Sequence, residues 1–305
     1  MKILITGATG FVGSALAAKL LSDGHELSIL TRDNEKVPAV FKNSKVKVFE
    51  WKDTHTLPPM ESIQGITGVI NLMGENIAAK RWTDEQKKKL RDSRIQSTIN
   101  LTTLLEQHLS SQLDFFVSAS AVGIYPVNQD AVMTEESHPG KNFLADLCKD
   151  WEAAAYTLKK VKRTVIIRTA VVLEQHGGAL AKMLPPFRLG LGGPIGNGDQ
   201  YMSWIHLDDL VNLYAKAATD SSFSGVYDGA APHPVENFHF TKALGHALHR
   251  PTLLPIPKAA LKLAFGEMSS VILDSQKVIS KRLPETSFSF RYETIESAMT
   301  KIFGH

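Results

Sequence analysis

The sequence predicts an α/β protein in which a doubly wound parallel sheet is followed by a small, mostly helical C-terminal module. Strand-like apolar segments alternate with segments of helical periodicity over most of the chain. Glycines gather in the turn between the first strand and the first helix, and the composition changes near residue 233. We therefore place the larger domain at residues 1–232 and the smaller one, on the substrate side, at 233–305.

The bulk composition excludes several classes of protein. Apolar residues make up 43% and charged residues 21% of the 305 residues, as in an ordinary soluble globular protein. The net charge of +3 is too small to indicate nucleic-acid binding, and no apolar run reaches the roughly 20 residues of a membrane span. Cys148 is the single cysteine, which fits a reducing compartment. We expect a cytoplasmic protein without a leader, because Met1 runs directly into a strand, and with neither nucleic acid nor membrane as partner.

The first strand and the turn after it form the most specific motif. The apolar run KILIT is followed by GATGFVG at 7–13, and helical spacing begins at Ser14. In such a unit the first glycine permits a tight turn, the second lets the backbone approach a pyrophosphate, and the third lets the helix pack closely. The helix N-terminus offers N–H groups to the phosphates. The motif predicts a Rossmann-type dinucleotide site with the cofactor-binding residues Gly7, Thr9, Gly10, Phe11, Val12 and Gly13.

The end of the second predicted strand, at 25–32, indicates which dinucleotide is bound. An NAD site usually has an acidic residue here, which bonds the ribose 2′-hydroxyl. This sequence has Thr31 and Arg32, and a guanidinium suits a 2′-phosphate in both charge and geometry. We therefore predict that Thr31 and Arg32 contact NADP(H). Asp33, one residue later, keeps NAD(H) open as the alternative.

The alternation continues with predicted strands at 46–51, 68–73, 115–126 and 164–173. A long helix follows the fourth strand, and Thr83 and Gln86 form a capping-box pattern at its start. The face of this helix that carries its apolar residues also carries Arg94. Because an unpaired buried charge is costly, we expect Arg94 to reach a polar cleft or a buried carboxylate.

Longer motifs resemble a known superfamily. GATGFVG, the serine-bearing strand at 115–126 and WIHLDDL at 204–210 are similar to the extended short-chain dehydrogenase/reductase superfamily, which includes sugar-nucleotide epimerases and dehydratases. NLMGENIAAKRW, GLGGPIGNGDQYMSWIH and RPTLLPIPKAALKLAFGE resemble more closely an atypical epimerase-like family that ends in a small domain of unknown function. The resemblance covers nearly the whole chain and implies a preference for NADP(H). It leaves the reaction open.

The resemblance also implies positions for site residues. Ser120, the third residue of Ser118-Ala119-Ser120, matches the serine that hydrogen-bonds the reacting oxygen, and Tyr125 lies near the same strand end. We predict that Ser120 and Tyr125 are catalytic. The stretch after the fourth strand passes beside the cofactor in the superfamily, so the further cofactor-binding residues are Leu72, Met73, Gly74 and Ser118. The candidates for the substrate cleft are Glu75, Asn76, Arg94, Tyr201 and His206.

The catalytic Tyr-x-x-x-Lys pair of the superfamily is missing from the segment NFLADLCKDWE at 142–152. In the superfamily this tyrosine transfers a proton and the lysine holds the nicotinamide ribose. Aligning the glutamate that usually follows the lysine with Glu152 puts Leu144 and Cys148 in the two places. A shift by one residue uses Lys149 but puts Ala145 where the tyrosine belongs. Neither register restores the pair.

Two further positions bear on the function. Tyr156 and Lys160 have the right spacing but lie about two helical turns too late, so we interpret them as a chance match. Nucleotide-sugar enzymes of the superfamily often have an arginine where this chain has Met202, and a thioether makes no charge-assisted phosphate bond. A nucleotide-sugar epimerase is therefore the least favoured prediction of the function. No sequence pattern typical of a metal site occurs.

Two functions remain. The first is an NADP(H)-dependent reductase of an unknown small carbonyl or enone, with Ser120 orienting the acceptor oxygen and Tyr125 or water supplying the proton. The second is a non-catalytic NADPH-binding sensor or partner-binding module, which the missing tyrosine favours. The sequence leaves both a monomer and a homodimer open.

Overall fold

The computed structural model describes residues 1–35, 37–42, 44–128 and 131–304, and it confirms the α/β class. Its central sheet has seven strands, all parallel, in the order β11-β7-β5-β4-β1-β2-β3. The order reverses between β1 and β4, and the carboxyl ends of strands at such a switch point form the usual ligand crevice. The strands are β1 (Lys2–Thr6), β2 (Glu26–Thr31), β3 (Val46–Glu50), β4 (Gly68–Asn71), β5 (Phe115–Ala121), β7 (Thr164–Thr169) and β11 (Gly225–Gly229).

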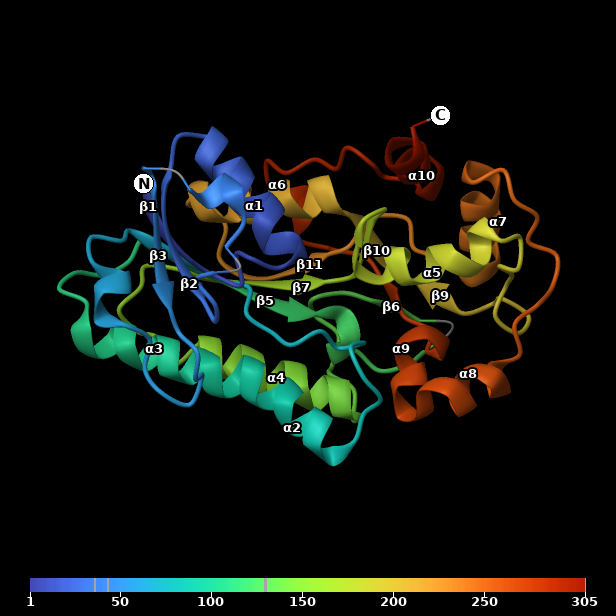
Figure 1. The fold of residues 1–305 in the computed structure, drawn as a ribbon, viewed down its shortest axis with the longest axis horizontal. Helices are drawn as coiled ribbons and strands as arrows, with labels where there is room; N and C mark the ends of the chain where they lie inside the picture. The colour runs from blue at the N-terminus through green and yellow to red at the C-terminus, as the bar shows by residue number, and fades with distance from the viewer. Residues whose placement is uncertain (36, 43, 129–130, 305) are drawn as a thin grey trace.

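Helices cover both faces of this sheet (Figure 1). On one face lie α1 (Phe11–Ser22) and α6 (Leu207–Thr219), whose leucines and alanines pack against the inward side chains of β1, β2 and β5. On the other lie α3 (Ser97–His108) and α4 (Phe143–Ala155). Because both faces of the sheet are buried, the sequences of its strands are nearly continuous runs of apolar residues.

The long helix predicted after β4 is interrupted. It begins with α2 (Asp84–Arg91), where the Thr83 hydroxyl accepts a hydrogen bond from the backbone N–H of Gln86 at 3.2 Å. A π-helical turn, Asp92–Gln96, then leads into α3. The cap was predicted and the π turn was not, because apolar spacing does not distinguish one wide turn from regular helix. Such turns are rare and often occur at functional sites, and this one carries Arg94.

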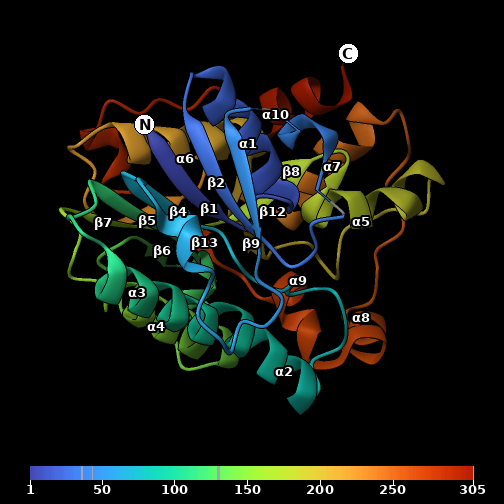
Figure 2. The same cartoon turned by 60° about the vertical axis from the view of Figure 1, so that its left-hand side comes forward.

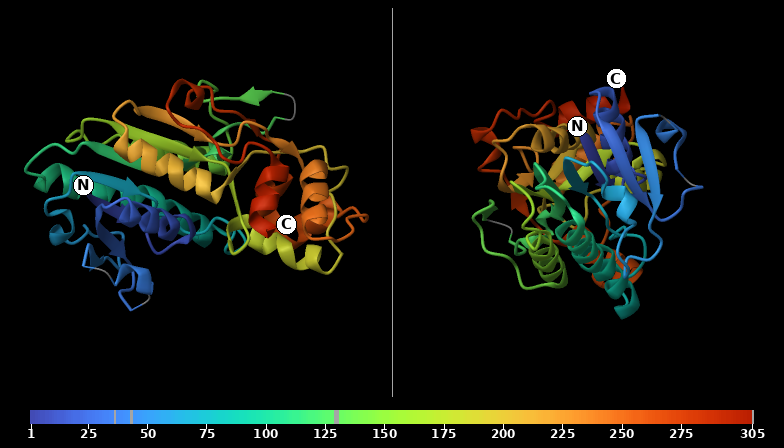
Figure 3. Two further views of the ribbon diagram at one scale, coloured as in Figure 1. Left: turned by 90° about the horizontal axis from the view of Figure 1, so that it is seen from above. Right: turned by 90° about the vertical axis from the view of Figure 1, so that its left-hand side faces the viewer.

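The predicted strand at 164–173 is broken at Ala170. Its second half, β8 (Val171–Glu174), leaves the central sheet and pairs with β10 (Trp204–His206). Beyond it lie α5 (Gly178–Arg188), α7 (Asn237–Ala247) and α10 (Ile295–Phe303), which share one apolar cluster. Figure 3 shows α7 and α10 side by side.

The rest of the C-terminal region packs on the opposite side, near α2 (Figure 2). It contains α8 (Lys258–Phe265) and α9 (Ser270–Leu273). Phe265 and Met268 join Trp82 and the first turn of α4 in one apolar cluster. Two short ribbons complete the elements: β9 (Tyr201–Met202) with β12 (Val235–Glu236), and β6 (Val132–Met133) with β13 (Lys277–Val278). None of the described helices is long and apolar enough to cross a membrane.

After β13 the chain returns to the central sheet. Arg282 donates hydrogen bonds to the carbonyls of Ser224 and Val226 at 2.8 and 2.7 Å, along the outer side of β11. The Asp209 carboxylate on α6 accepts the backbone N–H groups of residues 291 and 292. These hydrogen bonds attach the C-terminal residues to β11 and to α6.

Candidate active site

The turn after β1 has the geometry that its glycines predict. Gly7 has φ +68°, and a Cβ there would lie 2.7 Å from the Leu72 carbonyl oxygen, so only glycine fits without strain. A Cβ on Gly13 would lie 2.1 Å from the Gly7 carbonyl oxygen, which fixes how closely α1 approaches the loop. Gly10 is the N-cap of α1, and no side chain caps this helix. Its first N–H groups are therefore left for a ligand, as a bound pyrophosphate requires.

The other residues predicted around this loop surround it. Thr9 and Gly10 are exposed and Phe11 and Val12 half-buried, and the Phe11 ring packs directly on Gly177 at the start of α5. The chain leaves β4 through Leu72, Met73 and Gly74, and Leu72 lies against Gly7. Gly74 is exposed. The loop and the exit from β4 thus form one surface at the switch point.

Arg32 lies at the end of β2 with a side chain that is 75% exposed. The guanidinium lies 3.8 Å from the Glu75 carboxylate, so the structure brings together two residues predicted for different parts of the site. An exposed ion pair at this distance contributes little stability. Arg32 is therefore accessible to an anionic ligand. Thr31 is buried, and its hydroxyl hydrogen-bonds to the backbone of Asp33.

Ser118 is not on the ligand-facing surface. It is fully buried, and its hydroxyl accepts a hydrogen bond from Asn71 at 3.3 Å. Asn71 also bonds Thr6 and Thr98, so these polar groups tie β1, β4, β5 and α3 together. The side chain that we predicted to contact the cofactor serves this internal network instead.

Ser120, two residues further along the same face of β5, lies at the strand end. Its hydroxyl donates a hydrogen bond of 2.6 Å to Oε1 of Glu152 on α4. Arg168 on β7 binds the same carboxylate through both oxygens, at 2.8 and 2.9 Å. All three residues are buried, with at most 8% of the surface of each exposed. The ion pair fixes Glu152, and Glu152 in turn fixes Ser120.

Tyr125 belongs to the same network and does not reach an open cleft. It is fully buried; its hydroxyl accepts from Arg168 at 2.8 Å and donates to the Asp228 carboxylate at 2.8 Å. Burial, with the nearby Asp228, raises the pKa of Tyr125 well above its usual value, so its proton is held firmly. We therefore correct the predicted role: Tyr125 positions Arg168 and is not the proton donor.

Asp228 ends this network inside the protein. Burial, with the Glu135 carboxylate nearby, raises the pKa of Asp228 to about 8. Glu135 lies in the segment before α4 and accepts hydrogen bonds from the backbone N–H of Asp228 and from Ser280. Sequence reasoning used Glu152 only as a marker of register and missed Arg168 and Asp228. A charged residue in the middle of the apolar run TVIIRTAVVL was the available clue.

Leu144 and Cys148, the two positions that we aligned with the catalytic pair of the superfamily, are occupied by packed side chains. The Leu144 side chain lies against Gly123 and joins an apolar cluster with Phe143, Ile77 and Trp82. Cys148 is buried, and this burial, with Glu152 nearby, raises the pKa of its thiol to about 11. Both side chains are therefore neutral at ordinary pH, and neither replaces tyrosine or lysine.

Tyr156 and Lys160, which we interpreted as a chance match, lie at and after the C-terminal end of α4. Tyr156 is one helical turn beyond Glu152; burial, with the nearby Glu152, raises its pKa above the usual value. The Lys160 ammonium donates to the carbonyl of Leu109 at 3.2 Å and so connects the segment after α4 to the loop after α3.

Of the predicted cleft residues, Glu75, Asn76 and Arg94 lie together at the exit from β4. The Arg94 guanidinium donates to the carbonyl of Glu75 at 2.9 Å, and the Asn76 side chain closes a turn by accepting from the N–H of Ala78. Tyr201 lies in the β9–β12 ribbon, where its hydroxyl donates to Glu236 at 3.1 Å.

His206 is not a cleft residue. It is 3% exposed; its Nδ1 accepts the backbone N–H of Asp208 as the N-cap of α6, and its ring packs 4.2 Å from that of Tyr292. Burial lowers the pKa of His206, which favours the neutral ring that this cap requires. The prediction followed the solution pKa of histidine and missed the capping role.

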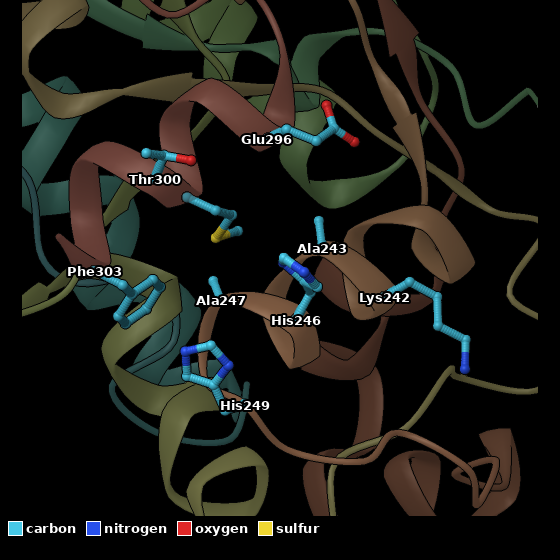
Figure 4. Close-up of a pocket in the computed structure, with 9 residues that line it drawn as sticks. Lys242, Ala243, His246, Ala247, His249, Glu296, Thr300 and Phe303 are labelled. Carbon is cyan, nitrogen blue, oxygen red and sulfur yellow. The ribbon is translucent and has the colours of Figure 1, made fainter. Parts of the chain in front are cut away.

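A groove of about 390 Å³ lies elsewhere, between α7 and α10 (Figure 4). It is lined by Lys242, His246, Glu296 and Phe303, among others. The Lys242 ammonium is already bonded to the carbonyl of Thr252 at 3.2 Å. The strands that carry the glycine loop and Ser120 contribute nothing to its lining, so we place the active site at the switch point and not in this groove.

Comparison with known proteins identifies the family of this chain. The model of the NAD dependent epimerase/dehydratase family matches residues 3–227, which is more than half of the chain. The chain belongs to the NAD dependent epimerase/dehydratase family. A second model, a domain of unknown function (DUF1731), matches residues 256–302. The resemblance to an epimerase-like family with such a C-terminal domain is thereby confirmed.

Relatives within this family match nearly the whole chain. The "Epimerase family protein SDR39U1 homolog, chloroplastic" of Arabidopsis thaliana is 40% identical over 99% of this chain and 86% of its own length. The Homo sapiens epimerase family protein SDR39U1 is 32% identical over 99% of each chain. A crystal structure of the human protein with NADPH has a TM-score of 0.88 and 32% identity, covering 100% of this chain and 99% of that one.

A second solved structure carries a different name. A nucleoside-diphosphate sugar epimerase from Corynebacterium glutamicum has a TM-score of 0.77 and 32% identity over 100% of this chain but 58% of its own. UDP-glucuronic acid 4-epimerase from Bacillus cereus, with NAD, has a TM-score of 0.79 at 15% identity, which is a likeness of fold alone. Both solved structures thus share the architecture of this chain.

Proposed function

We propose that this protein binds NADP(H) and reduces a small, mainly apolar carbonyl or enone. The observation that carries the proposal is the Ser120–Glu152 hydrogen bond at the carboxyl end of β5. It fixes one hydroxyl on the strand next to β4, whose exit lies against the glycine loop. NADP(H) is supported by the exposed Arg32, and the human relative was crystallised with NADPH.

The glycine loop fits such a cofactor because side chains at Gly7 and Gly13 would collide with backbone. The uncapped start of α1 would hold the pyrophosphate and Arg32 the 2′-phosphate. When bound, NADPH supplies the hydride. The Ser120 oxygen stays in place while its O–H rotates from Glu152 toward the acceptor oxygen, and the Glu152 carboxylate remains paired with Arg168. Since the proton of Tyr125 is held in the interior, solvent supplies the proton.

The chemical class of the substrate follows from what replaces the missing pair. Leu144 and Phe143 join Ile77, Trp82 and Phe265 in an apolar cluster beside the exit from β4. Such a surface favours an apolar substrate body with a single polar atom. Met202, where a diphosphate-binding arginine is common, is half-buried and packs in the cluster of α5 and α7. A nucleotide-sugar substrate is therefore disfavoured.

A non-catalytic NADPH sensor is the second candidate, and one observation favours it. Leu144 and Cys148 leave α4 without an ionisable group at ordinary pH in the two catalytic positions. A sensor would bind NADPH tightly without oxidising it. For either function we propose a cytoplasmic location, which the single cysteine supports.

The test begins with the dissociation constants of NADPH and NADH for the wild type and for Arg32→Ala. NADPH should bind at least tenfold more tightly to the wild type, and the substitution should remove the difference. Equal wild-type affinities would overturn the NADP(H) assignment.

Turnover is then followed as loss of NADPH absorbance with a panel of apolar aldehydes, ketones, enones and quinones. Ser120→Ala should lower kcat by roughly 100-fold, the usual effect of one preorganised donor. Ser118→Ala is the matched control, since it lies on the same face of the same strand and serves only the internal network. If no acceptor in the panel oxidises NADPH, the result favours the sensor. Full activity of Ser120→Ala would contradict the role assigned to Ser120.

A further inference from the structure

The Arg94 guanidinium has an unusual set of neighbours. It donates to two backbone carbonyls, those of Glu75 at 2.9 Å and Leu90 at 3.3 Å. Its central carbon lies 5.3 Å from the centre of the Trp151 ring, and a Cβ on Gly74 would lie 3.0 Å from that carbon. The π-helical turn that carries Arg94 directs it into the space between the exit from β4 and α4. These contacts fix the cation beside the exposed Gly74.

Arg94 has no acidic partner in the part of the chain that the structure describes. No carboxylate lies within 4.0 Å of its nitrogens, and the side chain of the nearby Glu75 is turned to Arg32. Burial lowers the pKa of Arg94, so the cation has lost part of its hydration. Of the five N–H groups of a guanidinium, the two carbonyls use two. Most of the residue is covered but part of it stays exposed, and the remaining N–H groups make no hydrogen bond to the described residues.

Arg94 lies close to the position of the missing lysine. The charge of Arg94 acts on the thiol of Cys148, which occupies that position, and Trp151 follows three residues later on α4. In the sheet, β2 with Arg32 is followed by β1 with the glycine loop, then by β4 and by β5 with Ser120. Arg94 reaches the β4 end of this row from the side of α4, between the pyrophosphate loop and the Ser120 strand.

We infer that Arg94 supplies the cation that α4 lacks, and that it binds the ribose hydroxyls on the nicotinamide side of the dinucleotide. A planar guanidinium with several free N–H groups matches a vicinal diol through two parallel hydrogen bonds. The lack of a carboxylate partner leaves these donors available. The inference rests on the proposed NADP(H) binding and assigns Arg94 to the cofactor, where the sequence placed it in the substrate cleft.

The experiment compares two ligands by isothermal titration calorimetry. NADPH contains the nicotinamide ribose, whereas 2′,5′-ADP keeps the adenosine phosphates and lacks it. Arg94→Ala should weaken NADPH binding by about 10- to 100-fold, the range for hydrogen bonds to a charged group, and should change 2′,5′-ADP binding less than about twofold. Arg94→Lys should recover part of the lost NADPH affinity, because lysine restores the positive charge but not the planar arrangement of N–H groups.

Two controls make the result decisive. Arg32→Ala should weaken the binding of both ligands. Arg91→Ala, which removes the exposed partner of Asp150 from the last residue of α2, should weaken neither. Equal losses of the two ligands for Arg94→Ala, or no loss, would overturn the inference while leaving the proposed function intact. If the wild type binds both 2′,5′-ADP and NADPH weakly, that result contradicts the proposed NADP(H) binding itself. If Arg94→Ala does not fold, the Arg94→Lys comparison with both ligands decides the question.

Discussion

The two halves of the candidate site are built differently. The loop after β1 is made of backbone: Gly7 and Gly13 let chain segments approach each other, and the uncapped N–H groups of α1 form the binding surface. The junction of β5 with α4 is made of side chains from four elements, namely Ser120, Glu152, Arg168 and Asp228 together with Tyr125. A backbone site depends on local spacing, and a side-chain site depends on contacts between distant segments.

The comparison predicts that the side-chain half is the more sensitive to single changes. Arg168→Met removes one partner of a buried ion pair and leaves the Glu152 charge without compensation. We expect it to lower the free energy of unfolding by about 3–5 kcal/mol, measured by urea denaturation. The double variant Arg168→Met, Glu152→Leu should be more stable than the single one, because no buried charge remains. A single variant that loses less than about 1 kcal/mol would contradict the buried pair.

In the backbone half, Gly7→Ala adds both left-handed strain and a collision with the Leu72 carbonyl. Strain alone costs roughly 1–2 kcal/mol. Gly24→Ala is a matched control, because Gly24 has φ +88° and open space around its Cβ position. Gly7→Ala should cost about 1–2 kcal/mol more than Gly24→Ala in thermal unfolding and should abolish NADPH binding. Equal costs for the two variants would show that the loop relaxes around the added methyl group.

The pH dependence of the free energy of unfolding tests the raised pKa of Asp228. The pKa of Asp228 is raised to about 8, whereas an unfolded aspartate titrates near 4. Between these values the folded protein keeps a proton that the unfolded chain has lost, so this group lowers stability as the pH rises. The slope is at most about 1.4 kcal/mol per pH unit.

Asp228→Asn cannot titrate, so its stability should fall less than that of the wild type between pH 5 and pH 8, values chosen to lie roughly within this window. Urea denaturation at both pH values measures the difference. Parallel curves for the two proteins would mean that Asp228 is ionised throughout the range.

The smallest expected effect concerns how α4 begins. The Asn142 side chain accepts the backbone N–H of Ala145 at 2.9 Å and caps the helix that carries Glu152. Asn142→Ala should cost about 1 kcal/mol, and Asn142→Asp should restore most of it. A loss for Asn142→Ala as large as that for Arg168→Met would show that the cap, and not the ion pair, holds α4 in place.

These differences also explain what the sequence could predict. The central strands, the glycine loop and the cap at Thr83 follow from local periodicity and spacing, and the structure has them. The break at Ala170 depends on backbone hydrogen bonds to residues distant in sequence, and the π turn at Asp92–Gln96 has the same apolar spacing as a regular helix. The network around Tyr125 joins residues up to 103 positions apart, so no local pattern could have assigned Tyr125 to the interior.

Arg282 has a consequence for how the molecule behaves in a crowded solution. β11 is the outermost strand on its side, and an uncovered strand of this kind is a template on which a second chain can add its own. The guanidinium occupies the carbonyls of Ser224 and Val226 and lies over the Tyr227 ring. The sheet is thus terminated by a positive charge, which repels a second copy presenting the same face. We therefore expect the segment after β13 to hinder the addition of a second strand at the β11 edge.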